Sequence, residues 1–383
     1  MILSESHLDR DPRVTVQIQS LQARYQLTCC GLSPPLDGSI PFIPFGTTYK
    51  SRQSQLLGLG GNRILLELLM KMKCYEQRYF FRKENRQTLR RLAGKCFDLI
   101  ICNDVDSLPM AAALKDSARC KIYLDAHEYT PRQWDGDARF QPRMAYWDYM
   151  LKKYAGSVDL MTTVCQSIAD EYEREFGLKS KNIVFNAPEY DANLEPSPME
   201  KGRIRLIHHG GLNRKRAPEV MLDLMDMLDE RFSLEFMVIP NRKAYLDEFV
   251  SSASRNPKIS FRDPVPTKEI AKTINQFDVG LYLLDQASFN HRHALPNKFF
   301  EYLHAGLGVA IWPSCNMKRI ADEGGFGIVS EDFTVESMAK KLNQISVEEV
   351  AVLKQAAVKA APRYCSQKSA ELIQENVKAL VGE

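Results

Sequence analysis

The distribution of apolar positions in the first half of the chain predicts short buried strands that alternate with helices. Strand-like runs lie at 1–4, 25–31, 97–102, 121–125 and 160–164. Helical spacing occurs at 14–23, 62–92 and 166–176, and residues 62–92 are expected to form one helix. Strands that are separated by helices predict a parallel sheet whose two faces are both covered.

A polar, proline-containing break at 195–202 separates this pattern from a second one of the same kind. Strands are then expected at 205–208, 234–239, 259–261, 279–284 and 308–312, and helices at 218–228, 297–304 and within 335–380. The chain is therefore predicted to be an α/β protein with two doubly wound Rossmann-like domains, residues 1–194 and 203–361. Residues 362–383 are expected to be a C-terminal helix.

Composition agrees with a two-domain globular protein. The 383 residues exceed the roughly 250–300 that one hydrophobic core usually serves. A net charge of +3 is too small to indicate a nucleic-acid partner. Nine scattered cysteines without a C-x-x-C pair predict free thiols in a reducing compartment, and no signal peptide or membrane-spanning run is found. A cytoplasmic protein is expected.

The segment 63–95 is more basic than the rest, with ten Lys or Arg residues against three Glu residues. Together with its apolar helical positions, this charge fits peripheral contact with an anionic membrane. A core helix with a solvated basic face explains the same residues, and both interpretations stay open.

The segment 294–310 has the features of a phosphate-binding helix start. Pro296 suits the first turn of a helix that begins near Asn297, and the free amides there attract anions. Lys298 adds positive charge, and Glu301 lies one turn further on the same face, where it could accept hydrogen bonds from ribose. A helix that merely starts at a proline and carries a Lys–Glu pair is the alternative.

Leu295 to Gly306, which reads L-P-N-K-F-F-E-Y-L-H-A-G, resembles the donor motif of retaining GT-B glycosyltransferases of family 4. The resemblance implies a GT-B fold, with two Rossmann-like domains that face a central cleft and a C-terminal helix that packs back on the first domain. It also places Leu295, Pro296, Asn297 and Lys298 at the donor diphosphate and Glu301 at the nucleotide ribose. One departure is His293, which replaces the first of two glutamates found in many members.

A second element is H-H-G-G-L-N-R-K-R at 208–216, which is expected to leave the strand 205–208 as a loop. Gly210 and Gly211 allow the backbone to approach a phosphate, and the basic residues that follow can neutralise it. The family resemblance makes Arg216 the best candidate for a phosphate contact. A solvated basic loop is the alternative.

Candidate acceptor-side residues lie at strand ends in the first domain. His127 and Glu128 follow the strand 121–125 in a D-x-H-E segment that resembles the acceptor side of the family's reaction centre. Asp104 and Asp106 either line the acceptor site or cap the next helix. Arg13 follows Asp11 and Pro12, so it either faces the cleft or only begins a capped helix.

The resemblance implies transfer of a sugar, with retention, from a UDP-, GDP- or other nucleotide sugar to a glycan or lipid-linked acceptor. Cell-surface polysaccharide synthesis, such as lipopolysaccharide or capsule, is the expected setting, at the inner face of the membrane. Lys298 and Arg216 would stabilise phosphate charge, His127 would position a substrate, and neither a metal nor a cofactor is expected. A non-catalytic GT-B partner subunit, suggested by His293, and a sugar-nucleotide epimerase of the same fold are the alternatives.

Overall fold

The computed structural model describes residues 1–46, 60–115 and 119–382, which form two compact units. Unit 1 consists of Met1–Phe185, Ser288–Asn290 and Ser369–Glu383, and unit 2 of Asn186–Ala287 and His291–Lys368. The predicted break at 195–202 therefore lies inside unit 2. Its residues are attached there, because Asn275 donates to the carbonyl of Glu195 at 2.8 Å and the Ser197 hydroxyl donates to Asn275 Oδ1 at 2.9 Å.

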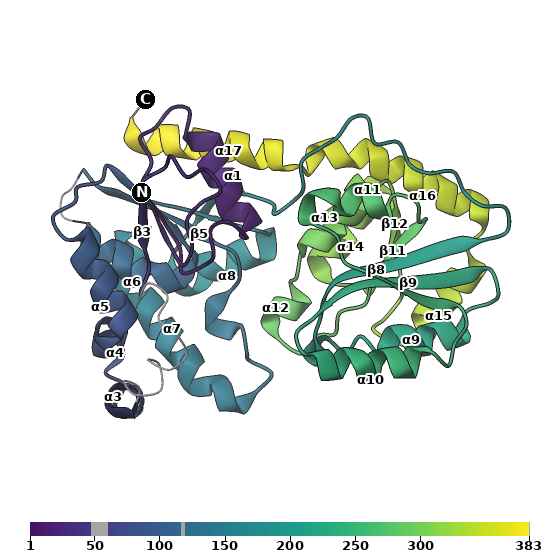
Figure 1. The fold of residues 1–383 in the computed structure, drawn as a ribbon, viewed down its shortest axis with the longest axis horizontal. Coiled ribbons are helices and arrows are strands. Elements are labelled where there is room, and N and C mark those ends of the chain that lie inside the picture. The colour runs from purple at the N-terminus through teal and green to yellow at the C-terminus, as the bar shows by residue number, and fades with distance from the viewer. Residues whose placement is uncertain (47–59, 116–118, 383) are drawn as a thin grey trace. The chain divides into compact units, whose positions relative to one another are not determined.

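The described residues of unit 1 form a parallel sheet of seven strands in the order β3-β2-β1-β4-β5-β6-β7. Figure 1 labels β3 and β5 of this sheet. The strands are β1 (Ile2–Leu3), β2 (Cys29–Gly31), β3 (Phe42–Pro44), β4 (Leu99–Asn103), β5 (Lys121–Ala126), β6 (Leu160–Thr163) and β7 (Ser180–Ile183). Every residue of β4 is buried, as expected for a parallel strand that is covered on both faces.

Helices cover both faces of this sheet. The helices of this unit are α1 (Pro12–Leu21), α3 (Gly60–Lys71), α4 (Tyr75–Phe81), α5 (Lys83–Leu92), α6 (Asp104–Leu114), α7 (Gln141–Tyr154), α8 (Gln166–Phe176) and α17 (Ser366–Val381), of which α3 packs on α4 and not on the described strands of the sheet. One core joins Val14 of α1 and Ile373 of α17 to Ile2 and Tyr123 of the sheet. The C-terminal helix therefore packs on the first domain from Ser369 onward.

The single helix expected over 62–92 is wrong, because the structure has three helices there. Lys73 has a left-handed backbone (φ 56°), and Arg82 is extended between α4 and α5. The predicted apolar face is divided as well. Tyr75 and Tyr79 are buried, whereas Leu65, Leu68 and Met72 of the same series are exposed.

The described residues of unit 2 form a parallel sheet of six strands in the order β10-β9-β8-β11-β12-β13. The strands are β8 (Ile204–Leu212), β9 (Phe232–Pro240), β10 (Ile259–Arg262), β11 (Val279–Tyr282), β12 (Gly308–Ile311) and β13 (Gly327–Val329). The helices are α9 (Val220–Met227), α10 (Lys243–Ala253), α11 (Ile270–Ile274), α13 (Asn297–His304), α14 (Cys315–Gly324), α15 (Val335–Gln344) and α16 (Val347–Ala360), while α12 (Phe289–Arg292) is divided between the units.

Both sheets reverse their strand order at one point, between β1 and β4 in unit 1 and between β8 and β11 in unit 2. Ligands of open parallel sheets bind beyond the carboxyl ends of the strands at such a point. Asp104 follows β4, Arg216 follows β8, and His127 follows β5, the neighbour of β4. The topology of each unit therefore brings its own candidate residues to the edge where a ligand is expected.

Candidate functional site

In unit 2, the glycine pair that was predicted to lie in a loop belongs to β8. This strand pairs with β9 in continuous register as far as Leu212 opposite Pro240, so Gly210 and Gly211 are ladder residues. The loop prediction is therefore wrong, because pairing with β9 extends the strand beyond His208. A single 3-10 turn, η4 (Arg214–Arg216), follows the strand.

Gly210 is required by the lysine that crosses it. Its backbone is left-handed (φ 106°), and a Cβ atom at this position would come within 3.1 Å of Lys298 Nζ. The same Nζ lies 4.8 Å from the centroid of the Tyr282 ring, which favours a cation above its face. The side chain of Lys298 therefore lies across the end of β8. A larger residue in place of Gly210 would push this side chain away from the backbone.

Lys298 is a buried lysine of α13 that pairs with no carboxylate of the described residues. No carboxylate among the described residues lies within ion-pair distance of its Nζ. Burial, and then the charge of Arg216, lower the pKa of Lys298 to about 7, although Glu301 opposes the shift. A buried unpaired cation is unfavourable, so an anionic ligand at this point would gain a strong interaction.

Glu301 is the second buried charge of α13. Burial raises the pKa of Glu301 to about 7, and Lys298 only partly opposes this shift. Its Oε2 lies 3.4 Å from Nε2 of His209, a residue of β8 that belongs to the predicted element 208–216 but was given no role in it. A polar residue within an apolar strand is the signal that could have revealed this role.

Tyr302 fixes the helix that carries both charges. Its ring packs directly on Gly280, where a Cβ atom would come within 2.1 Å of the ring. Its hydroxyl donates to the carbonyl of Leu281 at 3.3 Å and accepts from the backbone N–H of His209 at 3.4 Å. The motif tyrosine therefore attaches α13 to β11 and β8, which sets the positions of Lys298 and Glu301.

The remaining donor-side candidates lie in η4 and around the start of α13. Arg214 pairs with Glu248 and lies over the Tyr245 ring, whereas the exposed Arg216 is close enough for its charge to lower the pKa of Lys298. Leu295 is buried, and Asn297 is half-buried at the first position of α13. Pro296 is the N-cap, and its carbonyl accepts from the N–H of Phe299 at 3.0 Å. Their contacts with a ligand stay predictions.

The histidines that precede α13 have partners of their own. His291 Nδ1 lies 2.6 Å from Oδ1 of Asp285, and the carbonyl of His293 accepts from Asn316 at 2.8 Å. Across residues 1–46, 60–115 and 119–382, no three His, Cys, Asp or Glu side chains gather as a metal site would require. His293, where the resemblance to family 4 would place a glutamate, is thus tied through its backbone to α14.

In unit 1, Asp104 has a different role from the cap considered for it. The N-cap of α6 is Asn103, and Asp104 is the first helical residue, with a left-handed backbone (φ 59°). Asp104 Oδ1 accepts the backbone N–H of His127 at 2.8 Å. The capping interpretation is therefore wrong for Asp104, whose carboxylate reaches across to the end of β5.

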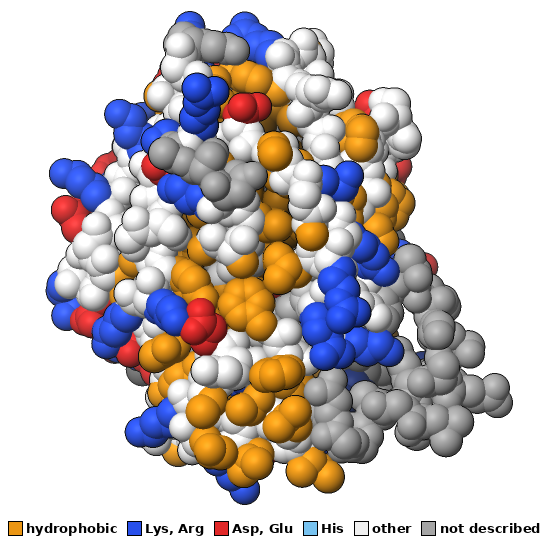
Figure 2. Space-filling view, turned by 90° about the vertical axis from the view of Figure 1, so that its left-hand side faces the viewer, with side chains coloured by type: hydrophobic (Ala, Val, Ile, Leu, Met, Phe, Trp, Pro, Cys, Tyr) orange, Lys and Arg blue, Asp and Glu red, His pale blue; other side chains and the backbone are white. Residues whose placement is uncertain are grey.

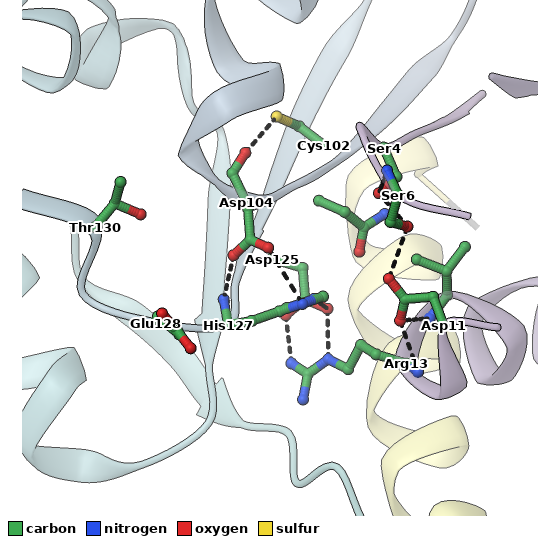
Figure 3. A network of polar contacts seen from close by, with 12 residues as sticks. Ser4, Ser6, Asp11, Arg13, Cys102, Asp104, Asp125, His127, Glu128 and Thr130 are labelled. Atoms are coloured by element: carbon green, nitrogen blue, oxygen red, sulfur yellow. Dashed lines mark hydrogen bonds and ion pairs between the residues drawn. The ribbon is translucent and has the colours of Figure 1, made fainter. Parts of the chain in front are cut away.

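His127 lies between two carboxylates (Figure 3). Its Nδ1 is 3.4 Å from Oδ2 of Asp104, and its Nε2 is 3.6 Å from Oδ2 of Asp125. Burial disfavours the charged ring, but Asp104 and then Asp125 outweigh it and raise the pKa of His127 to about 9. The side chain is therefore an imidazolium at neutral pH, a hydrogen-bond donor at both nitrogens.

Asp125 is the buried carboxylate at the centre of this network. Arg13 donates to both of its oxygens, Gln17 donates at 2.8 Å and Thr162 at 2.7 Å. Burial opposes the charge, but Arg13 and His127 lower the pKa of Asp125 well below its usual value. Asn103 completes the network by exchanging hydrogen bonds with the Gln17 amide at 2.9 Å.

The acceptor-side role predicted for Arg13 is wrong, because its side chain is 2% exposed and its remaining guanidinium bond goes to the carbonyl of Val184. It supports Asp125 instead. Gln17 was missed, and its position one turn after Arg13 on the same helical face is a signal that the sequence contains.

Glu128 is exposed, and its Oε2 accepts from Gln133 at 2.6 Å. Its predicted acceptor contact stays a prediction.

Solved structures of glycosyltransferases have the same fold as this chain. Sucrose-phosphate synthase from Thermosynechococcus elongatus matches with a TM-score of 0.70 at 11% identity, over 100% of this chain and 98% of that chain. The UDP-forming trehalose-phosphate synthase from Burkholderia vietnamiensis matches with a TM-score of 0.65 at 13% identity, over 99% of both chains. An Anabaena protein in complex with UDP and glucose matches with a TM-score of 0.66 at 13% identity, over 99% of this chain and 98% of that chain.

These likenesses confirm the predicted GT-B class, with two Rossmann-like parallel sheets. No protein-family model matches the sequence, and no curated protein matches it.

Proposed function

We propose that this protein is a glycosyltransferase that moves a sugar from a nucleoside diphosphate to a hydroxyl acceptor, with retention at the anomeric carbon. The observation that carries the proposal is the buried side chain of Lys298 at the start of α13, which lies across Gly210 and has no counter-ion in the part of the chain that the structure describes. The UDP in the names of two proteins of the same fold supports a UDP-sugar as the donor. GDP- and other nucleotide sugars are outcomes of the test below.

On the donor side, Lys298 and Arg216 neutralise the diphosphate, and the first amides of α13 together with the glycines of β8 allow it to approach the backbone. Leu295, Pro296 and Asn297 shape the entrance to this helix start. Glu301 lies one turn further along, where its carboxylate accepts hydrogen bonds from the ribose hydroxyls. Because the described residues give Lys298 no counter-ion, phosphate binding relieves an unfavourable charge as well as forming a contact.

On the acceptor side, the Nδ1–H group of His127 donates a hydrogen bond to a sugar oxygen, because Nε2 is buried against Asp125. An imidazolium has no lone pair, so it cannot take the proton of the acceptor hydroxyl. That proton passes to an oxygen of the leaving diphosphate, while the acceptor oxygen bonds to the anomeric carbon and the bond from that carbon to the diphosphate breaks. Catalysis then rests on positioning and on phosphate stabilisation. Asp104 holds His127 in place, and Glu128 is a further candidate contact for the acceptor.

The acceptor proposed here is a glycan or a lipid-linked sugar of cell-surface polysaccharide synthesis. An apolar stripe on α3 supports access to lipid. Ile64, Leu65 and Leu68 of α3, with Met72 directly after its end, form this α3 stripe, and they are 72%, 40%, 50% and 62% exposed. Figure 2 shows hydrophobic side chains gathered at the lower end of this face, with lysine and arginine side chains next to them.

The charges around the α3 stripe favour an anionic membrane surface. Arg63, Lys71 and Lys73 are exposed beside it, with Glu67 as the acidic residue of the same helix. An apolar helix face flanked by cations is typical of helices that lie in the plane of a membrane interface. In the described ranges no helix is long and apolar enough to cross a bilayer. Peripheral contact through α3, narrower than the predicted 63–95, is therefore the form of membrane contact proposed.

The donor proposal is tested by thermal unfolding and calorimetry with UDP, GDP, ADP, dTDP and CMP. A nucleoside diphosphate at about 100 times its Kd stabilises the folded state by about 2.7 kcal/mol, which raises Tm by several degrees. Lys298→Met should remove this stabilisation, whereas Lys340→Met, at an exposed lysine of unit 2, should keep it. If no nucleotide stabilises the wild type, the donor site is wrongly assigned.

Activity is tested with the donor selected in this way. The product formed on an oligosaccharide or lipid-linked acceptor should carry the donor's anomeric configuration, as read by NMR. A product that forms without any acceptor would identify an epimerase. Nucleotide binding without turnover, together with tight binding to another glycosyltransferase subunit, would identify a non-catalytic partner.

A further inference from the structure

His209 is a buried histidine whose ring faces the glutamate of the donor motif. It lies inside β8, and its side chain is 2% exposed. Its Nε2 is 3.4 Å from Oε2 of Glu301 and has no hydrogen-bond partner among the described residues. A buried polar nitrogen that has no partner is rare and calls for an explanation.

The surroundings of His209 fix both its charge and its orientation. Burial, and then the charge of Lys298, lower the pKa of His209 to about 3, so the ring is neutral and carries one N–H. The ring packs edge-on against Tyr302, with centroids 5.0 Å apart and planes at 82°. Because the backbone N–H of His209 also donates to the Tyr302 hydroxyl, the histidine and α13 are held by one side chain.

We propose that His209 is a positioning residue for Glu301, whose carboxylate it holds ionised and turned toward the ribose hydroxyls of the donor nucleotide. The Nε2–H group donates to one carboxylate oxygen, which leaves the other free to accept from the ligand. The inference rests on the proposed function, because it needs Glu301 to bind a ribose. The 3.4 Å separation is longer than a good hydrogen bond, so the proposal expects the two groups to move closer when a nucleotide binds.

The physical need for such a donor follows from the burial of Glu301. Burial favours the protonated carboxyl group, and Lys298 opposes this only in part. A protonated carboxyl group accepts fewer hydrogen bonds from a diol than a carboxylate does. A hydrogen bond from a neutral imidazole stabilises the charged form, and it does so without adding a second cation beside Lys298.

The test compares three ligands on three forms of the full chain by isothermal titration calorimetry. The ligands are UDP, 2′,3′-dideoxy-UDP and inorganic pyrophosphate. The proteins are the wild type, His209→Phe, which keeps a ring against Tyr302 but lacks the N–H group, and His209→Gln, whose amide can still donate. Thermal unfolding checks that each variant is folded, and His209→Leu replaces the phenylalanine variant if that one is not.

His209→Phe should lower the affinity for UDP about tenfold or more, the usual effect of losing a hydrogen bond to a charged group. The affinity for pyrophosphate should change less than about twofold. The preference for UDP over the dideoxy analogue should be smaller in the variant than in the wild type. His209→Gln should recover most of the UDP affinity. Equal losses for UDP and pyrophosphate, or an unchanged preference for the ribose hydroxyls, would overturn the inference. Failure of the wild type to bind UDP or pyrophosphate would instead reject the donor site.

Discussion

The carboxylate of Asp104 holds His127 at both its backbone and its ring. Oδ1 accepts the backbone N–H at 2.8 Å, and Oδ2 lies 3.4 Å from Nδ1. Asp104 itself has a left-handed backbone, which aspartate tolerates better than most residues do. This conformation at the first position of α6 turns the carboxylate back toward the end of β5. The charge state of His127 therefore depends on a residue that belongs to a neighbouring strand end.

Asp104→Asn should lower the pKa of His127 from about 9 toward its ordinary value of about 6.5. Asparagine keeps the tolerance for a left-handed backbone but removes the charge that favours the imidazolium. An NMR titration of the histidine ring signals measures the shift. Asp106→Asn is the matched control, because Asp106 follows the same strand and is not among the groups that shift His127. An unchanged pKa in Asp104→Asn would contradict the assignment.

The same substitution should change how stability depends on pH. The pKa of His127 is higher in the folded protein than in the unfolded chain, so its contribution is fully present below about pH 6.5 and is lost as the pH rises through about 9. The wild type should therefore exceed Asp104→Asn in free energy of unfolding by an amount that shrinks over this range. Denaturant unfolding at pH 6 and pH 9.5 measures the difference, and a gap that widens with pH would argue against it.

Lys298→Met should weaken nucleotide binding without destabilising the free protein. Loss of a charge-assisted contact predicts at least a tenfold loss of affinity for the selected nucleotide, about 1.4 kcal/mol or more. Methionine fills similar space without burying an unpaired charge, so the free protein should keep its stability or gain up to about 2 kcal/mol. Calorimetry and denaturant unfolding give the two quantities. A less stable free protein would mean that Lys298 is structural.

Gly210→Ala and Gly211→Ala should differ although the two glycines are adjacent in β8. At Gly210 the added methyl group meets Lys298 Nζ and an unfavourable backbone angle, whereas at Gly211 it meets no atom within 4 Å. We expect Gly210→Ala to cost about 1–3 kcal/mol of stability and to weaken nucleotide binding at least tenfold. Gly211→Ala should change both much less. Thermal unfolding measures the stability of the two variants, and calorimetry measures their nucleotide affinity. Equal effects of the two substitutions would show that the position of Lys298 does not depend on Gly210.

The α3 stripe should be needed for binding to anionic vesicles. Replacing Ile64, Leu68 and Met72 by serine should abolish co-sedimentation with phosphatidylglycerol vesicles, because it removes the apolar face that enters the interface. Val352→Ser is the control, since Val352 is equally exposed (66%) but belongs to unit 2. Wild-type binding should fall as salt rises. If the wild type does not sediment with the vesicles, the membrane contact is rejected. If the protein instead forms a dimer at all salt concentrations, α3 is covered by a second copy of the chain.

Features that depend on neighbours along the chain were predictable from the sequence. The helix over 297–304 was expected with the bounds that the structure has, because Pro296 starts it and Gly306, with its left-handed backbone, follows its end. The cap of α1 at Asp11, whose carboxylate accepts from the N–H of Arg13 and Val14, is local in the same way. Apolar runs indicated the buried parallel strands for the same reason, since each run is read within a few residues.

Only the tertiary structure decided which side chains meet. Gly210 and Gly211 became strand residues because β9 pairs beside them, and Arg13 became the partner of Asp125 because the fold places α1 next to the end of β5. The donor motif contains Lys298 and Glu301, but not the glycine that makes room for the lysine or the histidine that faces the glutamate. Periodicity and caps act over one or two helical turns. By contrast, the contacts of Lys298 with Gly210, of Glu301 with His209 and of Arg13 with Asp125 join residues about ninety or more positions apart, which the strand order brings together.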